Sequence, residues 1–176
     1  MRSRLFWGLP FVLLGTAALS EETCQDFATY QVCWPASDLV IYSGEQNGAA
    51  IFTISVMGIN TSVDVTGAFE NAAALKDEYL AGAQFFEGTY EELDADTEGV
   101  VMTFALSTPS DIPALAPLGR KAATPRIISI IQESGRMVVA ETFFPNRFAS
   151  EQDATWNTEK LDIHRRFTSY IRVPSS

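Results

Sequence analysis

The residues of this chain that could perform chemistry are few, and they match no catalytic motif. The single histidine, His164, stands beside Arg165 and Arg166 in a stretch with helical spacing. A nucleophilic triad would require a serine or a cysteine to approach this histidine. The sequence contains no G-x-S-x-G elbow, and Ser134-Gly135 falls in a predicted hairpin turn. We therefore expect His164 to be a surface or boundary residue of a helix, and no catalytic residue is assigned.

An acidic run from Glu91 to Gly99 comes nearest to a metal site. Counted from Asp94, its carboxylates occupy positions 1, 3 and 5 of a calcium loop, and a glycine occupies position 6. Position 12 should be a glutamate but is Ala105, and residues 100–107 have the pattern of a strand. The run is therefore predicted to be a solvated hairpin turn. One histidine excludes zinc sites built on several imidazoles, and no metal or cofactor is expected.

The basic residues are scarcer than the acidic ones, so their positions are more informative. Arg120, Lys121 and Arg126 lie at the end of a long segment, Thr108–Thr124, and three further arginines lie near the last predicted helix: Arg147, Arg165 and Arg166. If these groups converge, they could hold a carboxylate or a phosphate. The alternative is that each pairs with a local Asp or Glu. Arg120, Lys121 and Arg126 are the candidate ligand-binding or partner-binding residues.

The segment Thr108–Thr124 is also long for a connection between strands. It carries Pro109, Pro113 and Pro117, a spacing that favours neither a helix interior nor a sheet. Loops beyond about 12–15 residues in compact domains are commonly functional or disordered. The segment is expected to be either an ordinary long surface loop or, if the chain binds a ligand or partner, the place where binding occurs.

The two cysteines, Cys24 and Cys33, are close in sequence and even in number. In an oxidising compartment such a pair is expected to form a disulfide. Closing a loop of about ten residues stabilises the fold by roughly 2.7 kcal/mol in the chain-entropy model. The alternative is a redox or metal pair, but the spacing is not C-x-x-C.

The first twenty residues have the features of a cleavable export signal. Arg2 and Arg4 are followed by an apolar stretch, Leu5–Ala18, and the small residues Ala18 and Ser20 precede a predicted cut before Glu21. The stretch is shorter than the roughly 20 apolar residues that a membrane-spanning helix needs. We expect a periplasmic or secreted protein that is not stably inserted in a membrane after cleavage.

Charge excludes one further class of function. The chain has 176 residues and a net charge of −10, and loss of Arg2 and Arg4 would leave ten basic against 22 acidic residues, a net charge of −12. Binding to nucleic acid depends mainly on neutralising phosphate with Lys and Arg. No nucleic-acid partner is therefore expected.

Residues 37–176 are long enough for a single domain with one core.

Two predicted strands, Arg126–Gln132 and Arg136–Phe144, form the hairpin around which the other elements are arranged. Both are apolar on both faces, as in the isoleucines of the first strand. A strand with this pattern must be covered on both sides. We therefore place the hairpin at the centre of a sheet.

The remaining pattern predicts strands, a helix, four strands and a second helix. The ranges are a stapled segment Glu21–Ala36, strands Leu39–Tyr42 and Ala50–Met57, a helix Thr66–Ala83 capped by Thr66 or Asp64, a hairpin Gln84–Leu93 with Gly99–Ser107, and a helix of about Ser150–Tyr170. The predicted class is α+β, a largely antiparallel sheet with helices on its faces in an α/β/α sandwich.

This arrangement resembles the PsbP-like superfamily, which includes the extrinsic photosystem II protein and bacterial secreted relatives. The resemblance rests on the early hairpin Leu39–Met57, the helix Thr66–Ala83, the strands of Gln84–Phe144 and a final helix ending in Phe167-Thr168-Ser169-Tyr170. It implies a non-enzymatic exported domain that binds or helps to assemble a protein partner. The alternatives are a carrier of small anions with a pocket under the 108–124 loop, and a hydrolase without a recognisable motif.

Overall fold

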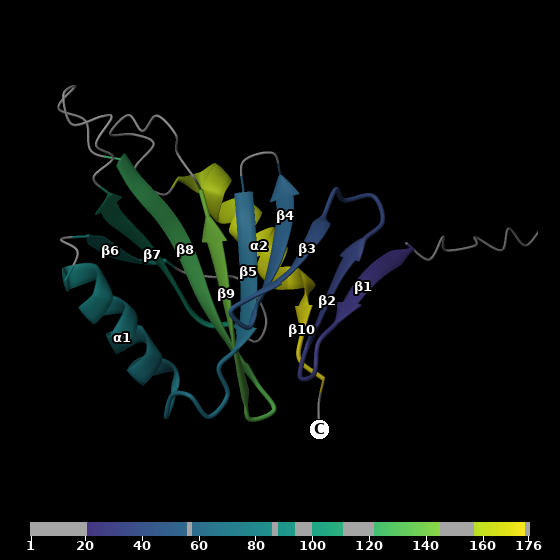
Figure 1. The fold of residues 1–176 in the computed structure, drawn as a ribbon, viewed down its shortest axis with the longest axis horizontal. Helices are drawn as coiled ribbons and strands as arrows, with labels where there is room; N and C mark the ends of the chain where they lie inside the picture. The colour runs from purple at the N-terminus through teal and green to yellow at the C-terminus, as the bar shows by residue number, and fades with distance from the viewer. Residues whose placement is uncertain are drawn as a thin grey trace, which may run out of the picture.

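The computed structural model describes residues 21–55, 58–85, 88–93, 100–110, 122–144 and 157–174 (Figure 1). The predicted export segment 1–20, the acidic turn 94–99, the inner part of the long loop and the start of the predicted last helix lie outside these residues. What the sequence indicates for them stays a prediction.

The main element is a seven-stranded antiparallel sheet in the order β3-β4-β5-β9-β8-β7-β6 (Figure 1). Its strands are β3 (Ile41–Gln46), β4 (Ala49–Ser55), β5 (Gly58–Asp64), β6 (Thr89–Leu93), β7 (Val100–Ser110), β8 (Ala122–Glu133) and β9 (Arg136–Phe143). The predicted central hairpin is β8–β9, which pairs antiparallel and lies inside the sheet. The prediction of its central position is confirmed.

The β8–β9 hairpin is covered on both faces, as its apolar pattern requires. Ile128 and Ile130 pack in one core cluster with α1 (Ala72–Phe85), whereas Ile131 and Val138 pack in another with α2 (Thr158–Tyr170). The turn between the strands has positive φ at both central residues, 50° at Ser134 and 76° at Gly135. This geometry matches the twist of a tight hairpin and favours glycine at its second position.

The first helix begins later than its pattern predicted. The side chain of Asn71 accepts a hydrogen bond from the Ala74 N–H and caps α1, so neither Thr66 nor Asp64 is the cap. Thr66 instead accepts a hydrogen bond from the Met137 N–H. Gly67 has a φ of 77°, a left-handed conformation that ends regular structure before the helix begins.

The last helix begins at Thr158, later than the predicted start near Ser150, because Asn157 is extended and its side chain caps the helix by accepting a hydrogen bond from the Lys160 N–H. Phe167 and Tyr170 of α2 are buried. α2 packs against the opposite side of the sheet from α1, across β4, β5, β8 and β9 (Figure 1). Among the described residues, no helix has the length and hydropathy to cross a membrane.

A second, three-stranded sheet was not foreseen from the sequence. It has the order β1-β2-β10 and consists of β1 (Glu22–Asp26), β2 (Gln31–Pro35) and β10 (Ile171–Arg172). Cys24 and Cys33 are directly opposite each other on β1 and β2 and form the predicted disulfide, with Cα atoms 4.1 Å apart. The fold is therefore α+β, with α1 on one face of the main sheet and α2 with this small sheet on the other.

Candidate functional site

Arg126 is the one predicted binding residue that lies within the described structure. It projects from β8 on the α1 side of the sheet, and its Nη1 lies 3.0 Å from Oε1 of Glu141 on β9. Both side chains are largely buried. Arg126 thus pairs with a local carboxylate, as the alternative interpretation of the arginines expected. Arg120 and Lys121 lie outside the described residues, so the structure does not bring the three together.

Burial dominates the electrostatics of this ion pair. It raises the pKa of Glu141, and the neighbouring guanidinium of Arg126 opposes that rise. Burial also raises the pKa of Tyr79 on α1, and the charge of Glu141 adds to the effect. Nε of Arg126 is buried and has no hydrogen-bond partner among the described residues. An anion that used Arg126 would have to compete with Glu141 for the guanidinium.

The ion pair borders a part of the sheet that α1 does not cover. α1 packs against β6 and β7, and its apolar cluster reaches β8 and β9. Farther along the same face, Ile41 on the edge strand β3 remains 54% exposed and Ile59 on β5 remains 41% exposed. We call this region the open face; by strand register it consists of Ile41, Ile51, Thr53, Ile59, Thr61 and Phe143.

The register places one row of these residues across β3, β4, β5 and β9, and the row continues to Arg126 on β8. Ile41 is opposite Thr53, Thr53 is opposite Ile59, Ile59 is opposite Phe143, and Phe143 is opposite Arg126. Side chains alternate between the two faces of a sheet, so this row points to one side. The open face therefore carries aliphatic and hydroxyl-bearing side chains and one aromatic ring, and its charged border is the Arg126–Glu141 pair.

The long loop is shorter than the sequence predicted. Thr108 pairs with Thr124, Pro109 with Ala123 and Ser110 with Ala122, so both ends of the predicted loop are strand. The expectation that its prolines keep the whole segment out of the sheet is wrong. Pro109 is tolerated because β6 pairs with β7 only as far as Ser107, so no β6 partner needs its missing N–H.

A buried chain of hydrogen bonds crosses the sheet beneath α2. Thr103 Oγ1 lies 2.6 Å from Ser129 Oγ, which lies 2.7 Å from Nε2 of His164. Nδ1 of His164 lies 2.8 Å from Thr142 Oγ1, which donates to Oδ1 of Asn60 at 2.6 Å. All five residues are buried. The expectation that His164 lies at the surface is therefore wrong.

The direction of this chain fixes the state of the histidine. Because Thr142 donates its only proton to Asn60, Nδ1 of His164 carries the proton that Thr142 accepts, and Nε2 accepts from Ser129. Burial, with the positive charge of Arg165 adding to it, lowers the pKa of His164 to about 3. The ring is neutral at ordinary pH and fastens α2 to the sheet.

Two polar residues in the strand sequences point to this cluster. Ser129 interrupts a run of isoleucines in a strand that is apolar on both faces, and Thr142 does the same near the end of β9. A polar residue buried in such a run needs a hydrogen-bond partner.

Among the described residues, no group of three or more His, Cys, Asp or Glu side chains could hold a metal ion.

This protein is similar to known proteins in its structure and not in its sequence. No family model matches the sequence, and no curated protein matches it. Of the solved structures, the Ran-binding protein Mog1p of Saccharomyces cerevisiae matches with a TM-score of 0.54 and 8% identity, over 89% of this chain and 97% of that chain. A mutant of protein Mog1 matches with a TM-score of 0.54 and 10% identity over the same shares.

The solution structure of cyanobacterial PsbP (CyanoP) from Synechocystis matches with a TM-score of 0.46 and 13% identity, over 91% of this chain and 96% of that chain. At such identities a structural likeness concerns the fold and carries no residue roles. The resemblance expected from the sequence is confirmed at the level of the fold: this chain has the Mog1/PsbP-like fold.

Proposed function

We propose that this protein is a non-enzymatic exported domain that binds, or assists the assembly of, a protein partner through its open face. The observation that carries the proposal is the exposure of Ile41 and Ile59 on a sheet face that α1 leaves uncovered. Large apolar side chains that stay exposed on one face of a sheet are favoured at interaction sites. A flat surface of side chains on paired strands suits a folded protein surface better than a small ligand, which binds in a concavity.

Two further observations support a binding role. The fold is shared with Mog1p, a protein described as Ran-binding, and a protein partner is the corresponding expectation for this chain. The nucleophile–base pair Ser129–His164 is buried beneath α2, where a substrate has no access to either side chain. The proposal therefore gives that pair a structural role.

The test is cross-linking in cells that express the tagged protein, followed by identification of what co-purifies. Ile41→Asp and Ile59→Asp place a charge on the open face, whereas Phe85→Asp places one on an equally apolar residue of α1 that is 81% exposed. We expect a stoichiometric partner whose recovery falls at least about tenfold in the two open-face variants and persists in Phe85→Asp. Absence of any partner above background, or equal recovery from all three variants, would overturn the proposal.

A carrier of small anions is the second candidate, with a pocket under the 108–124 loop. The observation in its favour is the buried Nε of Arg126, which has no hydrogen-bond partner among the described residues. Arg126→Ala and Arg120→Ala are the discriminating variants, measured by thermal shift and calorimetry against a panel of small anions. Unchanged anion affinity in both variants counts against a carrier.

A further inference from the structure

We propose that the Cys24–Cys33 disulfide is a redox-modification site that a dithiol reductant opens, and that opening it releases β1 from the edge of β2 while the rest of the domain stays folded. The inference is independent of the open face and of any partner bound there. It rests on how weakly β1 is otherwise attached, on which cysteine is exposed, and on what holds β2.

β1 contributes no buried side chain to the core. All five of its residues are exposed or half-buried, in contrast to β2, where Val32, Cys33 and Trp34 are buried. β1 is the edge of the small sheet, so within the described part of the chain its backbone pairs on one side only. A short edge strand without an apolar anchor is held by its ladder and by whatever cross-links it.

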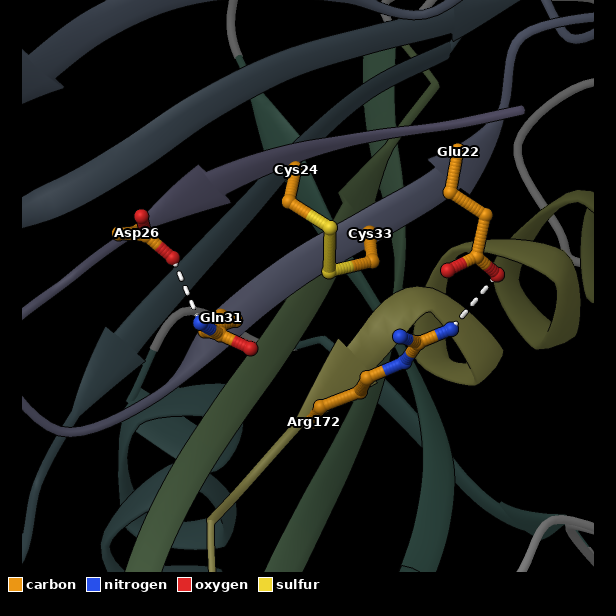
Figure 2. Close-up of a disulfide and its surroundings, with 6 residues drawn as sticks. All are labelled: Glu22, Cys24, Asp26, Gln31, Cys33 and Arg172. Carbon is orange, nitrogen blue, oxygen red and sulfur yellow. Dashed lines mark hydrogen bonds and ion pairs between the residues drawn. A yellow bond between two sulfur atoms is a disulfide. The ribbon is translucent and has the colours of Figure 1, made fainter.

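The side-chain cross-links of β1 to described residues lie together on one face of the small sheet, opposite the face that Val32 and Trp34 turn to the core (Figure 2). The disulfide stands between two polar pairs: Asp26 accepts a hydrogen bond from Gln31 at 2.7 Å, and Glu22 pairs with Arg172 at 2.7 Å. These polar pairs are exposed, and exposed pairs contribute little to stability because water and salt compete for them. The disulfide is therefore the cross-link that keeps β1 paired with β2.

The two sulfur atoms differ in access. Cys24 is exposed on the edge strand, whereas Cys33 is 2% exposed on the central strand. Arg172 on β10 reaches across β2 to Glu22 on β1, and by register this ion pair passes over Cys33. A thiolate from solvent therefore reaches the Cys24 sulfur.

The exchange balances with a dithiol as the reductant. One thiolate of the dithiol bonds to Sγ of Cys24, the bond between the two protein sulfurs breaks, and Cys33 leaves as a thiolate and takes a proton. The second thiol of the dithiol then displaces Cys24, which also becomes a thiol. The protein gains two electrons and two protons, and the dithiol becomes a disulfide.

The released segment is bounded by its neighbours. Phe27 stacks on Tyr30 with ring centroids 4.7 Å apart and packs against the main core cluster, so the chain stays anchored directly after Asp26. β2 is held on its other side by β10 and beneath by Val32 and Trp34 in that cluster. Opening the disulfide thus frees residues 22–26 and exposes one backbone edge of β2.

Hydrogen exchange read by mass spectrometry tests the proposal on the purified protein, oxidised and after treatment with dithiothreitol. We expect two titratable thiols per chain after reduction, and at least about tenfold faster exchange in peptides covering residues 22–26. Exchange in β4, β5 and β9 should not change. Cys24→Ser with Cys33→Ser should show the fast exchange without reductant and no response to it.

Arg172→Ala separates the disulfide from the ion pair. In the oxidised protein this variant should keep slow exchange in β1, and it should react with dithiothreitol at least as fast as the parent because the side chain over Cys33 is gone. Fully reduced protein with unchanged exchange in β1 would overturn the proposal, since the ladder alone would then hold the strand. So would loss of protection throughout the domain, because the disulfide would then staple the whole fold.

Discussion

Oγ of Ser129 lies 2.7 Å from Nε2 of His164, and both residues are buried between the sheet and α2. In an exposed cleft this distance would define a nucleophile and its base. Here the remaining hydrogen-bonding capacity of each group is taken by Thr103 and Thr142. The pair therefore acts as a polar connection between the helix and the sheet. Removing it should lower the free energy of unfolding.

Replacing His164 with leucine should destabilise the fold by about 2–4 kcal/mol, because Ser129 and Thr142 would each lose a buried hydrogen-bond partner. Unfolding in urea, followed by circular dichroism, gives the free energy. Ser169→Ala on the exposed side of the same helix is the control and should change it by less than about 0.5 kcal/mol. A His164→Leu variant as stable as the parent would contradict the structural role.

Stability should fall in acid because His164 stays neutral in the folded state. Its pKa is lowered from 6.5 to about 3 by burial, with Arg165 adding to the effect. Between these values the unfolded chain binds the proton and the folded chain does not, so falling pH favours unfolding, by up to about 1.4 kcal/mol per pH unit. The stability advantage of the parent over His164→Leu should shrink as pH falls from 6.5 towards 3. A difference in stability between parent and variant that stays constant with pH would contradict the neutral state of His164 in the folded protein.

The Arg126–Glu141 pair should show strong coupling. Arg126→Ala leaves the buried carboxylate of Glu141 without its cation and should cost about 3 kcal/mol. Glu141→Gln removes that charge, so the double variant should be more stable than Arg126→Ala alone. A double-mutant cycle from urea unfolding measures the coupling. Additive effects of the two changes would show that the pair does not stabilise the fold.

Two glycines should respond to alanine in opposite directions. Gly135 has a φ of 76° in the β8–β9 turn, and the described structure leaves open space around a Cβ built there, so Gly135→Ala should destabilise by about 1–2 kcal/mol through conformation alone. Gly82 lies exposed within α1, and Gly82→Ala should stabilise by about 0.5–1 kcal/mol. Thermal unfolding of the two variants compares them directly, and shifts of the same sign would refute the argument.

The sequence predicts best where local chemistry and burial agree. β8 and β9 are apolar on both faces, and their turn has the residue types that its positive φ values require, so the hairpin was recognisable. β5 was missed because its pattern is inverted. The positions that face α2 are Asn60 and Ser62, whereas Ile59 faces outward.

The polar residues of β5 are buried beside distant residues that bond to their oxygen atoms, whereas Nδ2 of Asn60 has no hydrogen-bond partner among the described residues. Thr142 donates to Asn60, and the hydroxyl of Tyr30 donates to the backbone carbonyl of Ser62. No local pattern contains such partners. The burial of His164 was not predicted for the same reason. Its charged neighbours Arg165 and Arg166 indicated a surface position, but its ring nitrogens form hydrogen bonds with Ser129 and Thr142, which are distant in sequence. Of the candidate site, Arg126 was found from the scarcity of basic residues, but its partner Glu141 could be named only from strand register.

The small sheet places β10 beside β2, with Ile171 opposite Val32. A chain that emerges residue by residue from a ribosome or a translocation pore presents Val32 and Trp34 long before the helix and strand that bury them. These contacts have a high sequence separation and form late. The domain therefore completes its folding only after its last strand has emerged, and until then an apolar segment near its N-terminus is available to chaperones.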